Sequence, residues 1–480
     1  MSIAIIPAPK KFKQLEGACQ TADIREISCP ELGQEAYRLS VTPNGAVITY
    51  GDAQGRLYGQ TTLRQLHQQY GDSIPCMEIE DRPALRYRSF HIDCARHYFP
   101  LDELKKMIDM ASYFKFNRFR WHFADDQGWR IECKAFPRLH EIGAYRAGDH
   151  FGNYSSDEPE GGYYTRSEVK ELIVFCRERG IEIVPDVDIP GHVKAILAAY
   201  PELGCTGNTV EVETKPGIFH EILCAGKEEV YRFLEALLDD LLELFPGEYF
   251  HIGGDETPKT QWKDCPHCKA RMEAENLASF QQLQGYMNNR IAACLAGRGR
   301  KAICWNEAAN GDNLNADVVV QYWAEDKDQH VAKHAAKGGK VILSPMMNAY
   351  CDYPHAFISA RSLHSLDIAP AELPRESVIG TECLVWTEYI RDAQCLESRA
   401  WPRFCANAEV GWCGNAHPDY EDFCGRLRVL YPVFEQHGIH ATPEKGWSPS
   451  MEEGMEELLA FKSNFTDAIR NDYRKAQEEV

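Results

Sequence analysis

Two carboxylates stand side by side in the segment "HIGGDET", where Asp255 and Glu256 follow Gly253 and Gly254. The residues before them continue an apolar, strand-like run, so the pair is expected at the end of a buried strand. Neighbouring side chains of a strand point to opposite faces unless the pleat breaks, and two glycines can supply such a break. Carboxyl groups placed in this way are candidates for general acid and base catalysis.

Polar and aromatic side chains follow seven further strand-like runs in the same manner. The residues at these ends are Arg96, Asp125, Asp188, His192, Trp305, Trp323, Tyr350, Asp352, Trp386 and Glu388. Random placement of charges in loops would not select tryptophan three times, so the pattern indicates a carboxylate-rich pocket with an aromatic wall. Aromatic faces stack on the apolar C–H faces of a pyranose, while carboxylates and arginine bind its hydroxyl groups. The run ends therefore predict a carbohydrate substrate.

The adjacency of Asp255 and Glu256 restricts the mechanism. Glycosidases usually place two carboxyl groups on opposite sides of the scissile bond, about 5–5.5 Å apart when retaining and about 6.5–9.5 Å apart when inverting. Adjacent residues approach the sugar from neighbouring directions instead. We therefore expect one of them to be the acid/base, with the nucleophile supplied by the substrate as the carbonyl oxygen of a 2-acetamido group. The second carboxylate would hold and polarise the acetamide N–H.

Two other classes of function are compatible with the same residues. His97, His122 and His192 with several aspartates are candidate ligands of a metal-dependent barrel hydrolase, although no two histidines have a tight ligand spacing. A sugar-binding protein without catalytic activity is the second alternative, against which the intact pair Asp255 and Glu256 argues. We expect no metal and no other cofactor at the site.

The strand-like runs alternate with helical periodicity along most of the chain. One helical segment, "SEVKELIVFCRERG", ends in a glycine C-cap at Gly180. Eight such runs separated by helices are typical of an α/β fold of the (β/α)₈ TIM-barrel type, whereas a doubly wound sheet usually needs fewer. The runs are "YRSFHIDCAR", "FNRFRWHFAD", "IEIVPDVDIP", "EYFHIGGDE", "KAICWNE", "DVVVQYWA", "KVILSPM" and "VIGTECLVW". In a barrel their C-terminal ends meet at one face, which would bring the polar residues together.

Two smaller parts are expected on either side of the barrel. Residues 1–82 combine the strand patterns "YRLSV" and "AVITY", the turn "PNG" and a helical segment, which predicts a small α+β domain. Residues 83–437 hold the eight runs of the catalytic barrel. Residues 438–480 predict a helical tail that either packs on the barrel or mediates assembly.

Composition is that of an ordinary globular protein. Of the 480 residues 44% are apolar and 26% charged, and a formal net charge of −20 argues against a nucleic-acid partner. The segment "MSIAIIPAPKKFKQLEG" lacks the pattern of a secretory signal, and no run approaches the roughly 18 apolar residues of a membrane span. We therefore expect a cytoplasmic protein without a membrane partner; the sequence leaves its oligomeric state open.

Eighteen cysteines are scattered over the chain, several of them in apolar runs, and we interpret most as buried reduced thiols. The exception is the segment "CPHC", which contains Cys265, His267 and Cys268. This spacing is that of half a zinc site, but no second pair follows at the spacing of a zinc ribbon. A structural or incidental pair is the favoured interpretation, and zinc binding and redox activity are the alternatives.

Four segments resemble the motifs of the family 20 glycoside hydrolases, the β-N-acetylhexosaminidases. "HIGGDE" resembles the acid/base motif of that family, "DCARHYFP" its first-strand arginine motif, "WHFADDQGWRIE" its second-strand block and "DVDIPGH" its third, in the same order. The likeness covers roughly residues 1–435, including the small domain that precedes the barrel in this family. It implies an exo-acting enzyme that removes terminal β-linked N-acetylglucosamine, N-acetylgalactosamine or both. The implied mechanism is retaining and substrate-assisted, through an oxazolinium-type intermediate.

The resemblance also implies a role for each site residue. Glu256 would be the general acid/base, and Asp255 would orient the acetamido group. The implied sugar-binding residues are Arg96, Asp352 and Glu388 for hydroxyl groups, Trp305, Trp323 and Trp386 for the acetamido methyl and the sugar face, and Tyr350 for the acetamido carbonyl. A network supporting Glu256 is implied for Asp125, His192 and Asp188. Tyr350 and Asp352, in "NAYCDYP", rest on a looser match. The choice between gluco and galacto sugars, and the tolerance of sulfated or disaccharide units, stay open.

Overall fold

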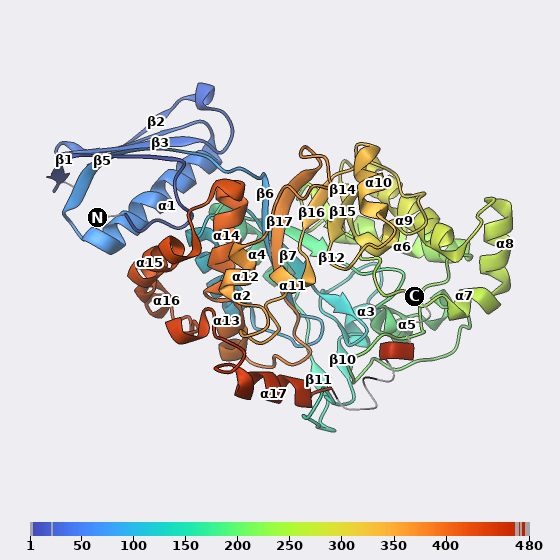
Figure 1. Ribbon diagram of the computed structural model, residues 1–480. Helices are drawn as coiled ribbons and strands as arrows, with labels where there is room; N and C mark the ends of the chain where they lie inside the picture. The colour runs from blue at the N-terminus through green and yellow to red at the C-terminus, as the bar shows by residue number, and fades with distance from the viewer. Residues whose placement is uncertain (1–2, 21–22, 466–469, 471–472, 476–480) are drawn as a thin grey trace.

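Eight parallel strands form a closed barrel in the computed structural model, which describes residues 3–20, 23–465, 470 and 473–475 (Figure 1). The strands are β6 (Tyr87–Asp93), β7 (Arg118–His122), β12 (Glu182–Asp186), β13 (Tyr249–His251), β14 (Lys301–Trp305), β15 (Val319–Tyr322), β16 (Val341–Leu343) and β17 (Val378–Val385). Pairing of β17 with β6 closes the ring. Each strand lies within one of the eight predicted runs, so the predicted (β/α)₈ barrel is confirmed.

The interior of the barrel changes from apolar to charged along the strands. Residues from five strands form a separate buried apolar cluster that contains Tyr87, Val184 and Ile303. Further along, Arg120 Nε lies 2.8 Å from Glu382 Oε1, and both side chains are fully buried. Buried charges are retained only when paired. This charged layer leads towards the C-terminal ends of the strands, where the polar residues of the sequence were expected to meet.

Helices surround the barrel and bury apolar stripes against it. The helices are α2 (Leu101–Tyr113), α4 (Arg166–Glu178), α5 (Lys194–Ala199), α6 (Glu228–Leu242), α7 (Thr260–Asp264), α8 (Pro266–Ala274), α9 (Phe280–Gly297), α10 (His330–Ala336), α11 (Met346–Ala349), α12 (Ala360–His364), α13 (Ala393–Ala400) and α14 (Arg403–Cys413). In α4, Thr165 and Glu168 form a reciprocal capping box, and Gly180 follows with a φ of 68°. The connection from β14 to β15 carries the 3₁₀ helix η3 (Asn306–Ala309).

Shorter elements complete the connections of the barrel. Between β7 and α4 lie β8 (Ala124–Asp125), β9 (Gly128–Trp129), α3 (Arg138–Glu141), β10 (Tyr145–Arg146) and β11 (Glu160–Gly161). After α14 come α15 (Tyr420–Leu430), α16 (Pro432–Gln436) and α17 (Met455–Ser463). Short 3₁₀ helices are η1 (Pro30–Leu32), η2 (Pro201–Leu203), η4 (Gly414–Ala416) and η5 (Glu444–Gly446). Among the described residues, no helix combines the length and apolar character needed to cross a membrane.

A five-stranded sheet with one helix precedes the barrel, as the sequence predicts. Its elements are β1 (Lys11–Cys19), β2 (Ile24–Ser28), β3 (Tyr37–Thr42), β4 (Gly45–Tyr50), α1 (Ala53–Tyr70) and β5 (Ile74–Asp81), with the strand order β1-β5-β3-β4-β2. The helix α1 lies between the sheet and the barrel helices (Figure 1). Trp412 of α14 packs into the core of this small domain, and its indole N–H donates to Asp81 Oδ1 (3.0 Å).

The predicted helical tail is described in part. The helix α17 lies in it, and its Phe461 packs against Tyr353 and Tyr389, with ring centroids 5.2 and 5.8 Å apart. Residues 466–469, 471–472 and 476–480 of the tail lie outside the described part of the chain. The tail therefore returns to the face of the barrel where the C-terminal strand ends lie.

Candidate active site

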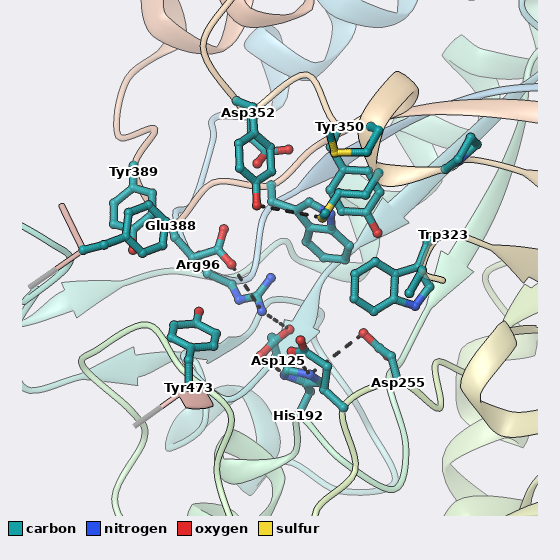
Figure 2. A pocket seen from close by; sticks show the side chains of 18 of the residues that line it. Arg96, Asp125, His192, Asp255, Trp323, Tyr350, Asp352, Glu388, Tyr389 and Tyr473 are labelled. Atoms are coloured by element: carbon teal, nitrogen blue, oxygen red, sulfur yellow. Dashed lines mark hydrogen bonds and ion pairs between the residues drawn. The ribbon is translucent and has the colours of Figure 1, made fainter. Parts of the chain in front are cut away.

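A cavity of about 870 Å³ opens at the C-terminal ends of the barrel strands. Its lining includes Arg96, Asp125, Asp188, His192, Asp255, Glu256, Trp323, Tyr350, Asp352, Trp386 and Glu388 (Figure 2). These are all of the site residues expected from the sequence except Trp305. The residues come from the ends of seven barrel strands, so the closure of the barrel, rather than any local spacing, brings them together.

The break in the pleat after β13 turns both adjacent carboxylates towards the cavity. Gly253 and Gly254 have φ angles of 60° and 105°, and Glu256 itself has a φ of 42°. A Cβ on Gly253 would lie 1.6 Å from Asp188 Oδ1, so only glycine fits there. The N–H of Gly254 donates to the same Asp188 oxygen (2.9 Å). Asp188 thus holds the turn that carries Asp255 and Glu256.

Glu307 stabilises the strained backbone of Glu256, a role that the sequence did not indicate. The N–H of Glu256 donates to Glu307 Oε2 at 3.2 Å. A left-handed φ is unfavourable for a residue with a side chain and persists only where the surroundings enforce it. Burial and the neighbouring Asp255 and Glu256 raise the pKa of Glu307 to about 8. Three carboxyl groups therefore share this corner of the cavity.

A chain of alternating histidines and aspartates leads from the cavity into the barrel. His192 Nδ1 lies 3.2 Å from Asp125 Oδ1, and Asp125 Oδ2 lies 2.9 Å from His122 Nε2. His122 Nδ1 is 2.8 Å from Asp186 Oδ2, and Asp186 Oδ1 is 3.2 Å from His251 Nδ1. All five side chains are buried. Each link fixes the orientation of the next ring, so the chain holds His192 rigidly.

His192 carries positive charge next to the two catalytic candidates. Burial opposes that charge, but Asp125, Asp126 and Glu256 raise the pKa of His192 well above its usual value. Its Nε2 lies 3.6 Å from Glu256 Oε2 and 4.0 Å from Asp255 Oδ2. A positively charged ring at this distance interacts electrostatically with both carboxyl groups.

Asp255 lines the cavity, and its side chain is 12% exposed. Within the described part of the chain, its Oδ1 is buried and has no hydrogen-bond partner. Leaving a buried carboxylate oxygen without a donor costs about 1–3 kcal/mol, more for a charged group. Burial and the nearby Asp255 raise the pKa of Asp188 well above its usual range, so a protonated Asp188 beside Asp255 is available as a donor from the protein. Figure 2 shows Asp255 next to Trp323 and on the same side as His192.

Aromatic rings form the wall next to Asp255. Trp323 and Tyr350 stack with centroids 5.9 Å apart, and Trp386 lies 6.3 Å from Tyr350. Trp305 is only 1% exposed and packs behind them, 6.3 Å from Trp323 and 6.1 Å from Trp386. The wall is thus two layers deep, and Trp305 supports the rings that line the cavity.

Charged groups occupy the opposite side of the cavity (Figure 2). The guanidinium of Arg96 lies 2.9 Å from Asp125 Oδ2 and 3.2 Å from Asp93 Oδ2, and 3.6 Å from Glu388 Oε1. Burial and the neighbouring Glu388 raise the pKa of Asp352 to about 7. These groups offer donors and acceptors for sugar hydroxyls, with the Arg96 plane fixed by two carboxylates.

The three histidines that favoured a metal-dependent hydrolase lie in two separate sets of contacts. His97 Nε2 is 3.3 Å from Asp149 Oδ2, whereas His122 and His192 both belong to the chain described above. His97 Nδ1 also lies 2.6 Å from the Thr387 carbonyl oxygen. Each ring is thus held by protein oxygens, and the cavity does not gather the three into one ligand set.

Comparison with known proteins places the chain in a family. The model of the catalytic domain of glycosyl hydrolase family 20 matches residues 85–415, and that of domain 2 of the same family matches residues 18–82. The chain belongs to glycosyl hydrolase family 20. The predicted family resemblance is therefore confirmed, and the two matches correspond to the barrel and to the small domain before it.

Relatives in family 20 extend over most of the chain. A beta-hexosaminidase from Akkermansia muciniphila is 34% identical over 442 residues, 88% of this chain and 89% of the relative. A beta-hexosaminidase from Porphyromonas gingivalis is 34% identical over 433 residues, 85% of this chain, and the match spans only 55% of that relative. A crystal structure of a β-N-acetylhexosaminidase has a TM-score of 0.86 at 31% identity and covers 94% of this chain and 99% of the other.

Aromatic residues of the C-terminal segment also line this family 20 site. Phe461, Phe465 and Tyr473 border the cavity on the side of Glu388 and Tyr389. The sequence predicted a helical tail but assigned it no site residue, because helical periodicity does not indicate which surface a helix covers. Phe461 and Phe465 are four positions apart, the spacing of one helical face, and this is the signal that could have indicated an apolar contact.

Proposed function

We propose that the protein is an exo-acting β-N-acetylhexosaminidase that removes terminal β-linked N-acetylglucosamine, N-acetylgalactosamine or both from oligosaccharides or glycan fragments. The observation that carries the proposal is the carboxylate of Asp255 at the cavity, beside Glu256 and next to an aromatic wall. An acetamido group satisfies all three features, because its N–H donates to the carboxylate and its methyl group packs against the rings. The names of the relatives agree with this activity.

The first chemical step breaks the glycosidic bond. Glu256 donates a proton to the glycosidic oxygen, and the acetamido carbonyl oxygen of the same sugar attacks the anomeric carbon from the opposite side. The leaving alcohol departs with the proton, and a cyclic oxazolinium ion remains. Asp255 accepts the hydrogen bond from the acetamide N–H and stabilises the positive charge that develops there.

The second step returns the enzyme to its starting state. The ionised Glu256 removes a proton from water, and the water oxygen attacks the anomeric carbon while the acetamido oxygen leaves it. Two inversions give net retention of configuration. The positive charge of His192, 3.6 Å from Glu256 Oε2, stabilises the carboxylate that the first step generates.

The charged side of the cavity accounts for exo action in this proposal. Arg96, Asp352 and Glu388 bind the outer hydroxyl groups of the terminal sugar, so the cavity holds one non-reducing unit. Asp93 and Asp125 fix the guanidinium of Arg96. The side of the guanidinium that lies towards Glu388 is therefore the side that contacts the substrate. Binding of polar groups in fixed positions supplies orientation as well as affinity.

A comparison of three aryl glycosides tests the proposed function. We expect hydrolysis of the N-acetyl-β-glucosaminide and the N-acetyl-β-galactosaminide, with a ratio that gives the gluco or galacto preference, and little hydrolysis of the plain β-glucoside. The anomer formed first, followed by proton NMR, should be β. Equal turnover of the plain glucoside would mean that the protein supplies its own nucleophile, and the assignment of Asp255 would be wrong.

We also propose a cytoplasmic location. All 18 cysteines lie in the described part of the chain, and none of them forms a disulfide there. Cysteines outside disulfides are typical of reducing compartments. Fractionation of the source cells, followed by immunodetection of the chain, tests the proposal. Recovery in the soluble cytoplasmic fraction is the expected result, and recovery outside the cytoplasmic membrane would contradict it.

A further inference from the structure

Four cysteine thiols from three distant segments meet beside the active-site barrel. The cluster consists of Cys205, Cys224, Cys265 and Cys268, and their four Sγ atoms lie within 4.8 Å of one another. Cys224, Cys265 and Cys268 are buried and Cys205 is partly exposed. Cys205 and Cys224 therefore lie next to the "CPHC" pair in the fold, although their positions in the sequence do not indicate it.

The distances between the sulfur atoms are those of a tetrahedral metal site. Cys224 Sγ lies 3.7 Å from both Cys265 Sγ and Cys268 Sγ, and Cys205 Sγ lies 3.9 Å from Cys268 Sγ. With Zn–S bonds of about 2.3 Å, the edges of a ZnS₄ tetrahedron are about 3.8 Å long. A disulfide requires an S–S distance of about 2.05 Å. We propose that these four cysteines bind one structural Zn²⁺ ion.

The backbone around the cluster supports a charged thiolate site. The N–H groups of Gly226 and Lys227 both donate hydrogen bonds to the Cys224 thiol. Lys227 is also the N-cap of α6, so the positive end of a 15-residue helix faces this sulfur. Four thiolates and one Zn²⁺ carry a net charge of −2. Backbone N–H groups that donate to the sulfur atoms lower the free-energy cost of burying this charge. Outer hydrogen bonds of this kind are a regular feature of metal sites.

The two ligand-bearing turns are in tight contact. A Cβ on Gly226 would lie 2.1 Å from the backbone carbon of His267 and 2.3 Å from the backbone nitrogen of Cys268. Only glycine permits this approach of the "CAGK" turn to the "CPHC" turn. The contact places Cys224 next to Cys265 and Cys268, which appeared in the sequence as a pair without further ligands.

The site joins the two loops that carry catalytic groups. The connection from β12 to α6 bears His192, Cys205 and Cys224, and the connection from β13 to α9 bears Glu256 and the "CPHC" pair. One further contact joins the same loops, because Trp262 Nε1 donates to the Leu223 carbonyl (2.9 Å). Within the first loop, the Leu223 N–H donates to the Pro190 carbonyl (3.0 Å). A zinc ion at this junction fixes one loop relative to the other without touching the substrate.

Metal content of the full chain tests the proposal independently of activity. The protein is produced in zinc-supplemented medium, purified without chelator and measured by plasma mass spectrometry. We expect about one zinc per chain, and an X-ray absorption spectrum with four sulfur neighbours at about 2.3 Å. Less than 0.1 zinc per chain, or nitrogen and oxygen neighbours in place of sulfur, would overturn the proposal.

A matched pair of variants assigns the zinc to the cluster. The double variant Cys265→Ser/Cys268→Ser should lose at least 90% of the zinc, whereas Cys29→Ser/Cys395→Ser, which replaces two partly exposed thiols elsewhere, should keep it. If the first variant does not fold, the wild-type protein decides: titration with a mercurial reagent should release one zinc as four thiols react. Detection of disulfides among these four residues in the non-reduced protein would show that they are not a zinc site.

Discussion

At the scale of single residues, Asp255 and Glu256 are neighbours in the chain but differ in their surroundings. Asp255 is nearly buried, whereas Glu256 is 22% exposed and lies beside the imidazole ring of His192. A carboxylate held rigidly by burial suits the role of orienting the acetamido group. An exposed carboxyl group at the cavity suits a proton carrier.

Replacement of Asp255 by asparagine tests the first of these roles. Asp255→Asn keeps the volume but removes the negative charge that stabilises the developing oxazolinium ion, so kcat should fall by about 10²–10³-fold. Steady-state hydrolysis of an aryl N-acetyl-β-glucosaminide measures the loss, and an unchanged melting temperature serves as the control for folding. Retention of most of the turnover would rule out the substrate-assisted mechanism.

A second residue-scale prediction concerns Glu307, whose pKa is raised to about 8 by burial and by Asp255 and Glu256. The folded protein keeps this proton where the unfolded chain has lost it, so the stability from this group is complete below about pH 4.5 and is lost as the pH rises through about 8. Glu307→Gln keeps an acceptor for the Glu256 N–H but cannot ionise. The variant should therefore lose less stability than the wild type between pH 5 and 8, by on the order of 1–3 kcal/mol.

Urea unfolding at pH 5, 6, 7 and 8 measures this difference. Glu372→Gln, at an exposed position, is the control and should follow the wild-type profile. Parallel profiles for Glu307→Gln and the wild type would show that Glu307 is ionised across this range in both states.

At the scale of elements, the backbone at the end of β13 determines the direction in which Asp255 and Glu256 point. Gly253 has a positive φ, and a Cβ there would lie 1.6 Å from Asp188 Oδ1, so Gly253→Ala forces the turn and Asp188 apart. We expect a loss of stability of about 2–4 kcal/mol and a loss of activity of at least 100-fold, because the carboxylates no longer point into the cavity. Thermal unfolding and steady-state kinetics measure the two effects.

The matched control is Gly425→Ala in α15, where a Cβ meets no described atom within 4 Å. Alanine at this helical position should leave activity unchanged and raise stability by up to about 1 kcal/mol. Equal effects of the two substitutions would mean that the conformation of Gly253 does not matter for the site.

At the scale of the whole molecule, a buried carboxylate joins the small domain to the barrel. Asp81 at the end of β5 accepts hydrogen bonds from Tyr37 and from the Trp412 indole, and lies 3.4 Å from the Lys115 ammonium. Both members of the ion pair are fully buried. Burial lowers the pKa of Lys115, so its charge depends on this partner. We infer that the two parts unfold together.

Asp81→Asn should therefore destabilise the entire chain by about 3–5 kcal/mol, because it leaves a buried ammonium without its counter-charge. Urea unfolding followed by fluorescence and by circular dichroism should give one coincident transition in the wild type and in the variant. Glu78→Gln, on an exposed position of the same strand, should unfold as the wild type does. Two separate transitions in the wild type would show that the domains are independent.

The barrel, the small domain and the acid/base pair follow from the sequence by itself, because each rests on a local signal. Strand-like runs and helical periodicity repeat over short distances, and the polar ends of the runs must meet once the strands close a barrel. "HIGGDE" and the other three motifs are also short segments, and they are sufficient to indicate the family. Family membership is confirmed by the matches over residues 18–82 and 85–415.

Tertiary structure alone decided which distant residues share a site. Glu307 reaches the Glu256 backbone across 51 positions, and Cys205 and Cys224 complete the "CPHC" pair from 63 and 44 positions before Cys268. Trp305 is the last residue of β14, whereas Trp323 and Trp386 follow their strands, and packing places Trp305 behind the cavity wall. Sequence patterns record the period of each element and not the contacts between elements. Those contacts depend on how the barrel closes and on how its loops pack against one another.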